Sequence, residues 1–170
     1  MPAADQGIAK SKDRYHLVPR VLCFVTLGDE VLLLKGAPTK KIWPGKYNGL
    51  GGHVERGESM HAAALREIRE EAGVEVKDLR LRGVITIETG EPAGIGLFVF
   101  TATALERAVR PSAEGTLEWI PAHRIAELDT VEDLPLLLSR ILTVRPDSPS
   151  FSARYSYSAD DHLVIEFFED

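Results

Sequence analysis

Apolar and polar positions alternate in blocks that mark strands and turns in the first third of the chain. Residues 20–27 are mostly apolar, residues 28–30 form a polar turn, and residues 31–35 are again mostly apolar. Two such runs joined by a short polar turn predict a β-hairpin. Residues 36–45, rich in proline and glycine, predict a loop, and the glycine-rich stretch 47–54 predicts a short strand that leads into a helix.

The strongest helical signal covers residues 60–72. Ser59 is a suitable N-cap, the residues after it are good helix formers, and Gly73 is a suitable C-terminal stop. With about 100° between successive residues, His61 falls on the same side of this helix as Ile68. We expect that side to pack against a sheet.

The rest of the chain alternates strands with shorter helices. The pattern predicts strands at 79–88, 96–104 and 116–120, helical stretches at 122–128 and 134–143, and a closing hairpin over 151–168. No repeat or long linker divides the sequence. We therefore predict an α+β fold built on a mixed sheet, with a disordered tail at residues 1–14 and a single domain at residues 15–170.

Composition narrows the classes of partner. Acidic residues outnumber basic ones, 26 to 20, for a formal net charge of −6. Proteins that grip nucleic-acid polymers usually carry a basic face, so small phosphorylated ligands are favoured, with metal ions as the bridge to the carboxylates. No apolar run is long enough to span a membrane. A lone Cys23 in an apolar run fits a reducing cytoplasm.

Three carboxylates share a second arc of the predicted helix. Glu67, Glu70 and Glu71 lie three and four residues apart, a spacing that brings side chains together on one face. Hard oxygen ligands of this kind select Mg²⁺, with Mn²⁺ as a substitute. A solvated acidic face is the common alternative explanation. The flanking Arg66 and the glycines at 49, 51 and 52, which permit close backbone approach, favour the metal hypothesis.

The segment 52–74 resembles the Nudix box at every defined position. Gly52, Glu58 and the run REIREEAGV at 66–74 stand at the spacing of that family. The resemblance implies an α/β/α sandwich around a mixed sheet, in which the box forms a loop–helix–loop. It also implies that divalent ions bind Glu67, Glu70, Glu71 and the Gly51 carbonyl, and that Arg66 pairs with Glu58 to orient the helix.

The same resemblance implies hydrolysis of a diphosphate by a metal-activated water. Glu70 is the first choice for general base and Glu71 the second, and the box does not decide between them. Outside the box, Tyr47–Gly52 looks like the corresponding segment of the 8-oxo-dGTP diphosphatase branch. Asn48 then corresponds to the amide that contacts the purine, with a simple turn Asn before Gly as the alternative.

Further positions match that branch less closely. Glu114 falls where it carries one more metal-binding or catalytic glutamate, and Asp129 falls where it carries a base-contacting acid. Thr130 replaces the partner acid, whose role would pass to Glu132 or Asp133. His53 stands where lysine is common. His53 and Lys35 are candidate phosphate contacts, and for both the alternative is a plain solvent-exposed side chain.

We thus expect an Mg²⁺-dependent enzyme that converts a purine nucleoside triphosphate, oxidised or not, to monophosphate and pyrophosphate. ADP-ribose or a dinucleotide is the second substrate class. A nucleotide-binding regulator without turnover is the third hypothesis, against which stands the complete set of box carboxylates. Partners are expected to be small nucleotides rather than nucleic-acid polymers or membranes, and the protein to be a monomer or homodimer.

Overall fold

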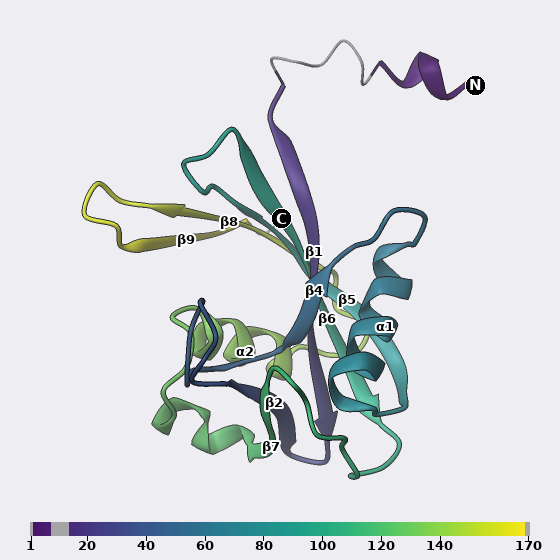
Figure 1. The fold of residues 1–170 in the computed structure, drawn as a ribbon, viewed down its shortest axis with the longest axis vertical. Coiled ribbons are helices and arrows are strands. Elements are labelled where there is room, and N and C mark those ends of the chain that lie inside the picture. The colour runs from purple at the N-terminus through teal and green to yellow at the C-terminus, as the bar shows by residue number, and fades with distance from the viewer. Residues whose placement is uncertain (1, 8–13, 169–170) are drawn as a thin grey trace.

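The computed structural model describes residues 2–7 and 14–168, and its centre is a mixed β-sheet (Figure 1). The main strand order is β3-β2-β1-β6-β5-β8-β9, with β4 beside β1 and β7 beside β2. The strands are β1 (His16–Leu27), β2 (Glu30–Gly36), β3 (Tyr47–Asn48), β4 (Leu50–His53), β5 (Val76–Ile87), β6 (Ala93–Ala104), β7 (Gly115–Pro121), β8 (Phe151–Tyr157) and β9 (Leu163–Phe168). The predicted strands and hairpins are all present.

Parallel and antiparallel pairs are combined in this sheet. β1 runs parallel to β6 and β5 runs parallel to β8, whereas β1–β2, β5–β6 and β8–β9 are antiparallel. On its other side, β1 pairs first with β4, from Arg20 to Cys23, and then with β2, from Val25 to Leu27. The long β1 strand therefore holds the glycine-rich β4 and then β2 one after the other along the same edge.

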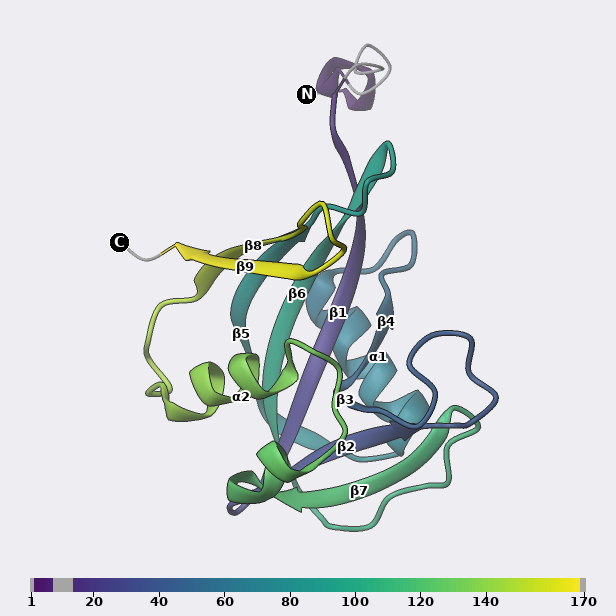
Figure 2. The ribbon, with the colours of Figure 1, turned by 90° about the vertical axis from the view of Figure 1, so that its left-hand side faces the viewer.

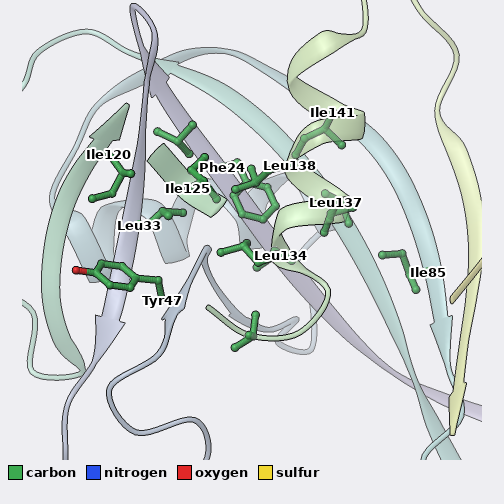
Figure 3. Close-up of a cluster of buried hydrophobic side chains, with 14 of the residues drawn as sticks. Phe24, Leu33, Tyr47, Ile85, Ile120, Ile125, Leu134, Leu137, Leu138 and Ile141 are labelled. Carbon is green, nitrogen blue, oxygen red and sulfur yellow. The ribbon is translucent and has the colours of Figure 1, made fainter. Parts of the chain in front are cut away.

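Two helices cover opposite faces of the sheet (Figures 1 and 2): α1 (Met60–Ala72) and α2 (Leu134–Thr143). Leu22 and Phe24 of β1 pack in the cluster on the α2 side, and the alternating Val21 and Cys23 pack in the cluster on the α1 side. Figure 3 shows Phe24 beside the leucines of α2. Burial on both faces explains why these strands read as continuous apolar runs, and the predicted α+β sandwich is confirmed.

Helix α1 begins and ends where the sequence predicts. Ser59 Oγ accepts a hydrogen bond from the Ala62 N–H at 3.1 Å, and Gly73 adopts a left-handed φ of 67°. The expected packing of His61 against the sheet is wrong, because His61 is exposed. In the first turn of α1 it is Met60 that packs against the cluster on this side of the sheet, and His61 beside it projects to solvent.

The N-terminal prediction is only partly covered by the structure. Of the expected tail at 1–14, residues 1 and 8–13 lie outside the described residues, and Ala3–Gln6 form a short 3-10 helix, η1. The helical stretch after β7 is also 3-10, η3 (Ala122–Glu127). In the described ranges 2–7 and 14–168, no helix combines the length and apolarity needed to cross a membrane.

Candidate active site

The carboxylates of α1 lie against the glycine-rich strand β4. The Gly51 N–H donates a hydrogen bond to Glu71 Oε2 at 2.8 Å. Gly52 faces Glu67 so closely that a Cβ added to Gly52 would lie 2.5 Å from Glu67 Oε1. Both glycines therefore leave room for a carboxylate to touch the backbone, which is the close approach that the sequence predicts.

Gly51 is required by its own backbone as well. Its φ of 154° is rare for residues with a side chain, and a Cβ there would lie 2.1 Å from the Val21 carbonyl oxygen of β1. Because that obstacle is backbone in the centre of the sheet, no side-chain rotation relieves it.

Arg66 connects the loop before α1 to the carboxylates on it. Its guanidinium makes a two-point contact with Glu58, Nη2 to Oε1 at 2.7 Å and Nε to Oε2 at 3.2 Å. Its Nη1 donates to Glu67 at 2.8 Å and to Glu70 at 3.1 Å, and its Nη2 also donates to the His53 carbonyl at 3.0 Å. Bidentate pairs of this type fix orientation as well as charge.

The Arg66 contacts also shift the ionisation of its partners. The Arg66 guanidinium, followed by a backbone N–H, holds the pKa of Glu58 below its ordinary value. Glu58, then Glu67, raise the pKa of Arg66 in turn. The pair that the resemblance implies is thus present in the structure, and it is fully charged at neutral pH.

Glu71 has the most perturbed carboxyl group of the box. Only 8% of the residue is exposed, and burial raises its pKa to about 7, assisted by the negative charges of Glu114 and Glu67 and opposed by the Gly51 hydrogen bond and Lys40. The same field reaches the sheet, where burial, then Glu71 and Glu67, raise the pKa of Cys23. Cys23 is buried, as expected of a small residue in a strand.

The donor set fits a hard divalent cation. Oxygen atoms of Glu67 and Glu71 adjoin the Gly51–Gly52 backbone in a region where carboxylates outnumber the two cations, Arg66 and Lys40, and a divalent cation would offset the excess negative charge. Glu70 is the more exposed carboxylate, at 60%, and contacts Arg66. Over the part of the chain that the structure describes, no three acidic, His or Cys side chains already converge as a ready-made metal cluster.

Glu114 lies in the loop before β7 and joins this region from another part of the chain. Lys40 Nζ contacts Glu114 Oε2 at 2.6 Å, and the Ala37 N–H donates to the Glu114 carbonyl at 2.9 Å. Lys40 was not among the sequence-predicted site residues. The signal that could have found it is the Lys40–Lys41 pair in the loop, which does not by itself say which lysine faces the carboxylates.

The segment at 129–133 meets strand β3. The Tyr47 N–H donates to the Asp129 carbonyl at 2.9 Å, and the Val131 N–H donates to the Tyr47 carbonyl at 3.1 Å. Figure 3 shows the Tyr47 ring beside Leu33 and Ile120. The adjacent Asn48 uses its Oδ1 to accept from the Gly49 N–H at 2.8 Å, as a turn Asn does. Its amide NH₂ makes no hydrogen bond to residues 2–7 or 14–168 and is the group available to a ligand.

The two candidate acids of that segment face different surroundings. Asp129 has a side chain that is 75% exposed and contacts Lys46 Nζ at 2.7 Å. Asp133 precedes α2, and burial raises its pKa. It adjoins Tyr155 of β8, whose pKa is raised by burial and by the Asp133 charge.

The two candidate phosphate contacts, Lys35 and His53, are exposed side chains near the ends of β2 and β4. Lys35 is exposed and lies over the Tyr47 ring, 5.3 Å from its centroid. His53 ends β4 with an exposed side chain, and its carbonyl accepts from Arg66. A separate cavity of about 420 Å³ lies between the β1–β2 turn, the start of β5 and the end of α2, and none of the predicted site residues lines it.

Comparison with known proteins identifies the class to which this fold and site belong. The family model described as NUDIX domain matches residues 16–141. The chain therefore belongs to the Nudix family, as the box resemblance indicates. In the described chain this match covers β1 through most of α2, so it includes both helices that flank the sheet.

Individual relatives are more specific. The chain is 48% identical over 68 residues to the NAD-capped RNA hydrolase NudC of Pseudomonas aeruginosa, a match covering 40% of this chain but only 23% of that protein. It is 31% identical over 113 residues to the oxidized purine nucleoside triphosphate hydrolase of Mus musculus, covering 64% and 72% of the two chains. The MutT protein of Bacillus halodurans has a similar solved structure, with TM-score 0.74, 27% identity and coverage of 89% and 97%.

Proposed function

We propose that this protein hydrolyses a purine nucleoside triphosphate to the monophosphate and pyrophosphate with the help of a divalent metal ion, Mg²⁺ by preference. The observation that carries the proposal is the contact set of Arg66. One guanidinium holds Glu58, Glu67 and Glu70 together while β4 receives Glu67 and Glu71. So many carboxylates in one place repel each other and destabilise the fold unless bound cations offset their charge.

The residues that would hold the ion are Glu67, Glu70, Glu71 and Glu114, with the Gly51 carbonyl as a backbone ligand. When bound, the ion lowers the pKa of a water molecule and offsets the charge that develops on the phosphate oxygens. Arg66 and Glu58 keep the α1 carboxylates in register with β4. Glu70 is the first candidate to accept the proton of the attacking water because it is the most accessible of the three, and Glu71 is the second.

The purine preference rests on Asn48 and on the neighbouring 129–133 segment. The free NH₂ of Asn48 is a donor suited to an acceptor on a purine edge. Of the two acids, Asp133 is the better base contact, because Asp129 is turned to solvent and to Lys46. The likeness to the oxidized purine nucleoside triphosphate hydrolase, which covers more of this chain than the NudC match does, supports the same substrate class.

A dinucleotide or nucleotide-capped substrate is the second candidate. It is favoured by the 48% identity to NudC, although the chain spans about a quarter of the length of that relative. ADP-ribose is a further ligand of the same class, bound by the Nudix domain of Shewanella oneidensis NrtR, a fold neighbour at 17% identity. We further propose that the substrate is a free small nucleotide in a reducing cytoplasm, in keeping with the net charge of −6 and the buried Cys23.

The test is a substrate panel with product identification. The purified protein is incubated with Mg²⁺ and canonical or 8-oxo purine triphosphates, NAD, dinucleotides and ADP-ribose. Monophosphate and pyrophosphate from a purine triphosphate support the proposal, and excess chelator should abolish them. Release of inorganic phosphate instead, or selective cleavage of NAD or ADP-ribose, refutes the proposed substrate class. Failure to turn over any compound refutes the enzyme hypothesis.

Variants of the carboxylates locate the chemistry. Glu70→Gln should reduce kcat by about 100-fold or more, as loss of a general base does, while leaving the melting temperature nearly unchanged because the side chain is exposed. Glu75→Gln is the matched control, an exposed glutamate beyond the helix whose side chain pairs with Arg69. Full activity in Glu70→Gln together with inactive Glu71→Gln would transfer the base role to Glu71.

A further inference from the structure

Lys40 lies in the loop between β2 and β3, whose two ends are joined by backbone hydrogen bonds. The Gly45 N–H donates to the Gly36 carbonyl at 2.9 Å while the Gly36 N–H donates to the Lys46 carbonyl at 3.0 Å. Within the loop, the Lys40 N–H donates to the Ala37 carbonyl at 3.0 Å. These bonds hold the stem of the loop and direct Lys40 to Glu114.

The ammonium of Lys40 pairs with Glu114, and its charge also acts on Glu71 of the box. It contacts Glu114 Oε2 at 2.6 Å, and its positive charge opposes the rise in the Glu71 pKa that Glu114 promotes. Its neighbour Lys41 is exposed and makes no hydrogen bond or ion pair with any residue in the described ranges. The loop thus presents one lysine to the carboxylates and a second, of equal charge, to solvent.

A lysine in this position competes with a divalent cation. Both need the Glu114 carboxylate, and the lysine contact is the more easily given up, since Lys40 is 34% exposed on a flexible four-carbon stem. Once displaced, the ammonium remains tethered beside the metal-binding carboxylates. The phosphates of a metal-bound nucleotide must lie there too, and they offer it a new anionic partner.

We propose that Lys40 exchanges partners during turnover: it neutralises Glu114 while the carboxylates are empty, and it binds the substrate's phosphate chain once divalent ions have taken Glu114. The second half rests on the proposed function, because it assumes a phosphorylated substrate. The first half concerns only the protein and its cation.

The first half is tested by titrating the protein with Mn²⁺ in the absence of nucleotide. Electron paramagnetic resonance measures the free Mn²⁺ and so gives the dissociation constant. Lys40→Met should tighten Mn²⁺ binding by about three- to tenfold, the effect of removing one nearby competing charge. Lys41→Met, the matched control, should change it less than about twofold because its charge lies in solvent. The Lys40→Met effect should vanish in a Glu114→Gln background. An equal gain in that background, or an equal gain from Lys41→Met, overturns the exchange.

The second half is tested with Mg²⁺ and a non-hydrolysable α,β-methylene purine triphosphate. Lys40→Met should weaken binding of this analogue about tenfold, whereas Lys40→Arg should restore most of the affinity. In turnover of the hydrolysable purine triphosphate, Lys40→Met should raise KM more than it lowers kcat. Unchanged affinity in Lys40→Met overturns the phosphate contact. If the substrate panel shows no hydrolysis at all, the Mn²⁺ measurements still decide whether Lys40 and the cation share Glu114, so the two failures are distinct.

Discussion

Gly52→Ala isolates the position of Glu67 from the stability of the fold. The added Cβ would lie 2.5 Å from Glu67 Oε1 and 2.7 Å from its Cδ. Because nonbonded atoms settle about 3.5 Å apart, the carboxylate must retreat by about 1 Å. A misplacement of that size in a catalytic group costs on the order of 100-fold in rate. The displaced group is the end of a flexible side chain, so unfolding free energy should change by less than about 1 kcal/mol.

The assay is kcat/KM on the best substrate of the panel, together with urea unfolding of the same sample. Gly96→Ala is the control, because the nearest atoms to a Cβ at that strand glycine are side-chain atoms of Leu17 and Phe98 at ordinary contact distances of 3.5 to 3.9 Å. Gly51→Ala marks the opposite extreme, since its Cβ would strike the Val21 carbonyl and should prevent folding. Wild-type kcat/KM in a folded Gly52→Ala protein would show that the Glu67 position does not matter to the reaction.

Three further changes test the packing and the charges. Asp133→Asn should stabilise the protein at pH 7 and do so less at pH 4. Burial raises the folded-state pKa of Asp133, so the stability of the wild type falls as pH rises through that pKa. Equal gains in unfolding free energy at both pH values would contradict this. Glu58→Gln should destabilise the protein at pH 7 but not in acid. Arg66 lowers the folded-state pKa of Glu58, and the stabilisation from the ion pair is lost as pH falls through that pKa. A loss of unfolding free energy that is the same at every pH in urea titrations argues against the pair. Ile68→Ala should cost about 2–5 kcal/mol in the same titrations, because Ile68 is fully buried between α1 and the sheet, and a loss below about 1 kcal/mol refutes its core role.

Local signals account for the parts of the fold that were predictable. Ser59 and Gly73 delimit α1 because capping depends on a few adjacent atoms. The Arg66–Glu58 pair was implied by the family resemblance, and the two residues lie only eight positions apart in the sequence. The strand pattern also survived, although β5 and β6 begin a few residues earlier than their apolar runs suggested.

Long-range packing decided what the sequence could not show. A helical wheel places Glu71 with Glu67 and Glu70, yet Glu71 is buried because β4, reached through a loop, covers that edge of α1. The opposite error was made for His61, which the wheel places on the packed side but which is exposed, because Met60 occupies that place in the first turn. Lys40 meets Glu114 across 74 positions of sequence, a contact that no local pattern encodes.

The alternation along β1 has a consequence for how such a protein can change its specificity. Leu22 and Phe24 support the layer that carries Asp133 and Tyr155, whereas Val21 and Cys23 support the layer beneath Glu67 and Glu71. The two layers share strands but no side chains. Substitutions in the layer that carries Asp133 can therefore accumulate without moving Glu67 and Glu71, so the proposed substrate side and the proposed metal side can change independently on the same backbone.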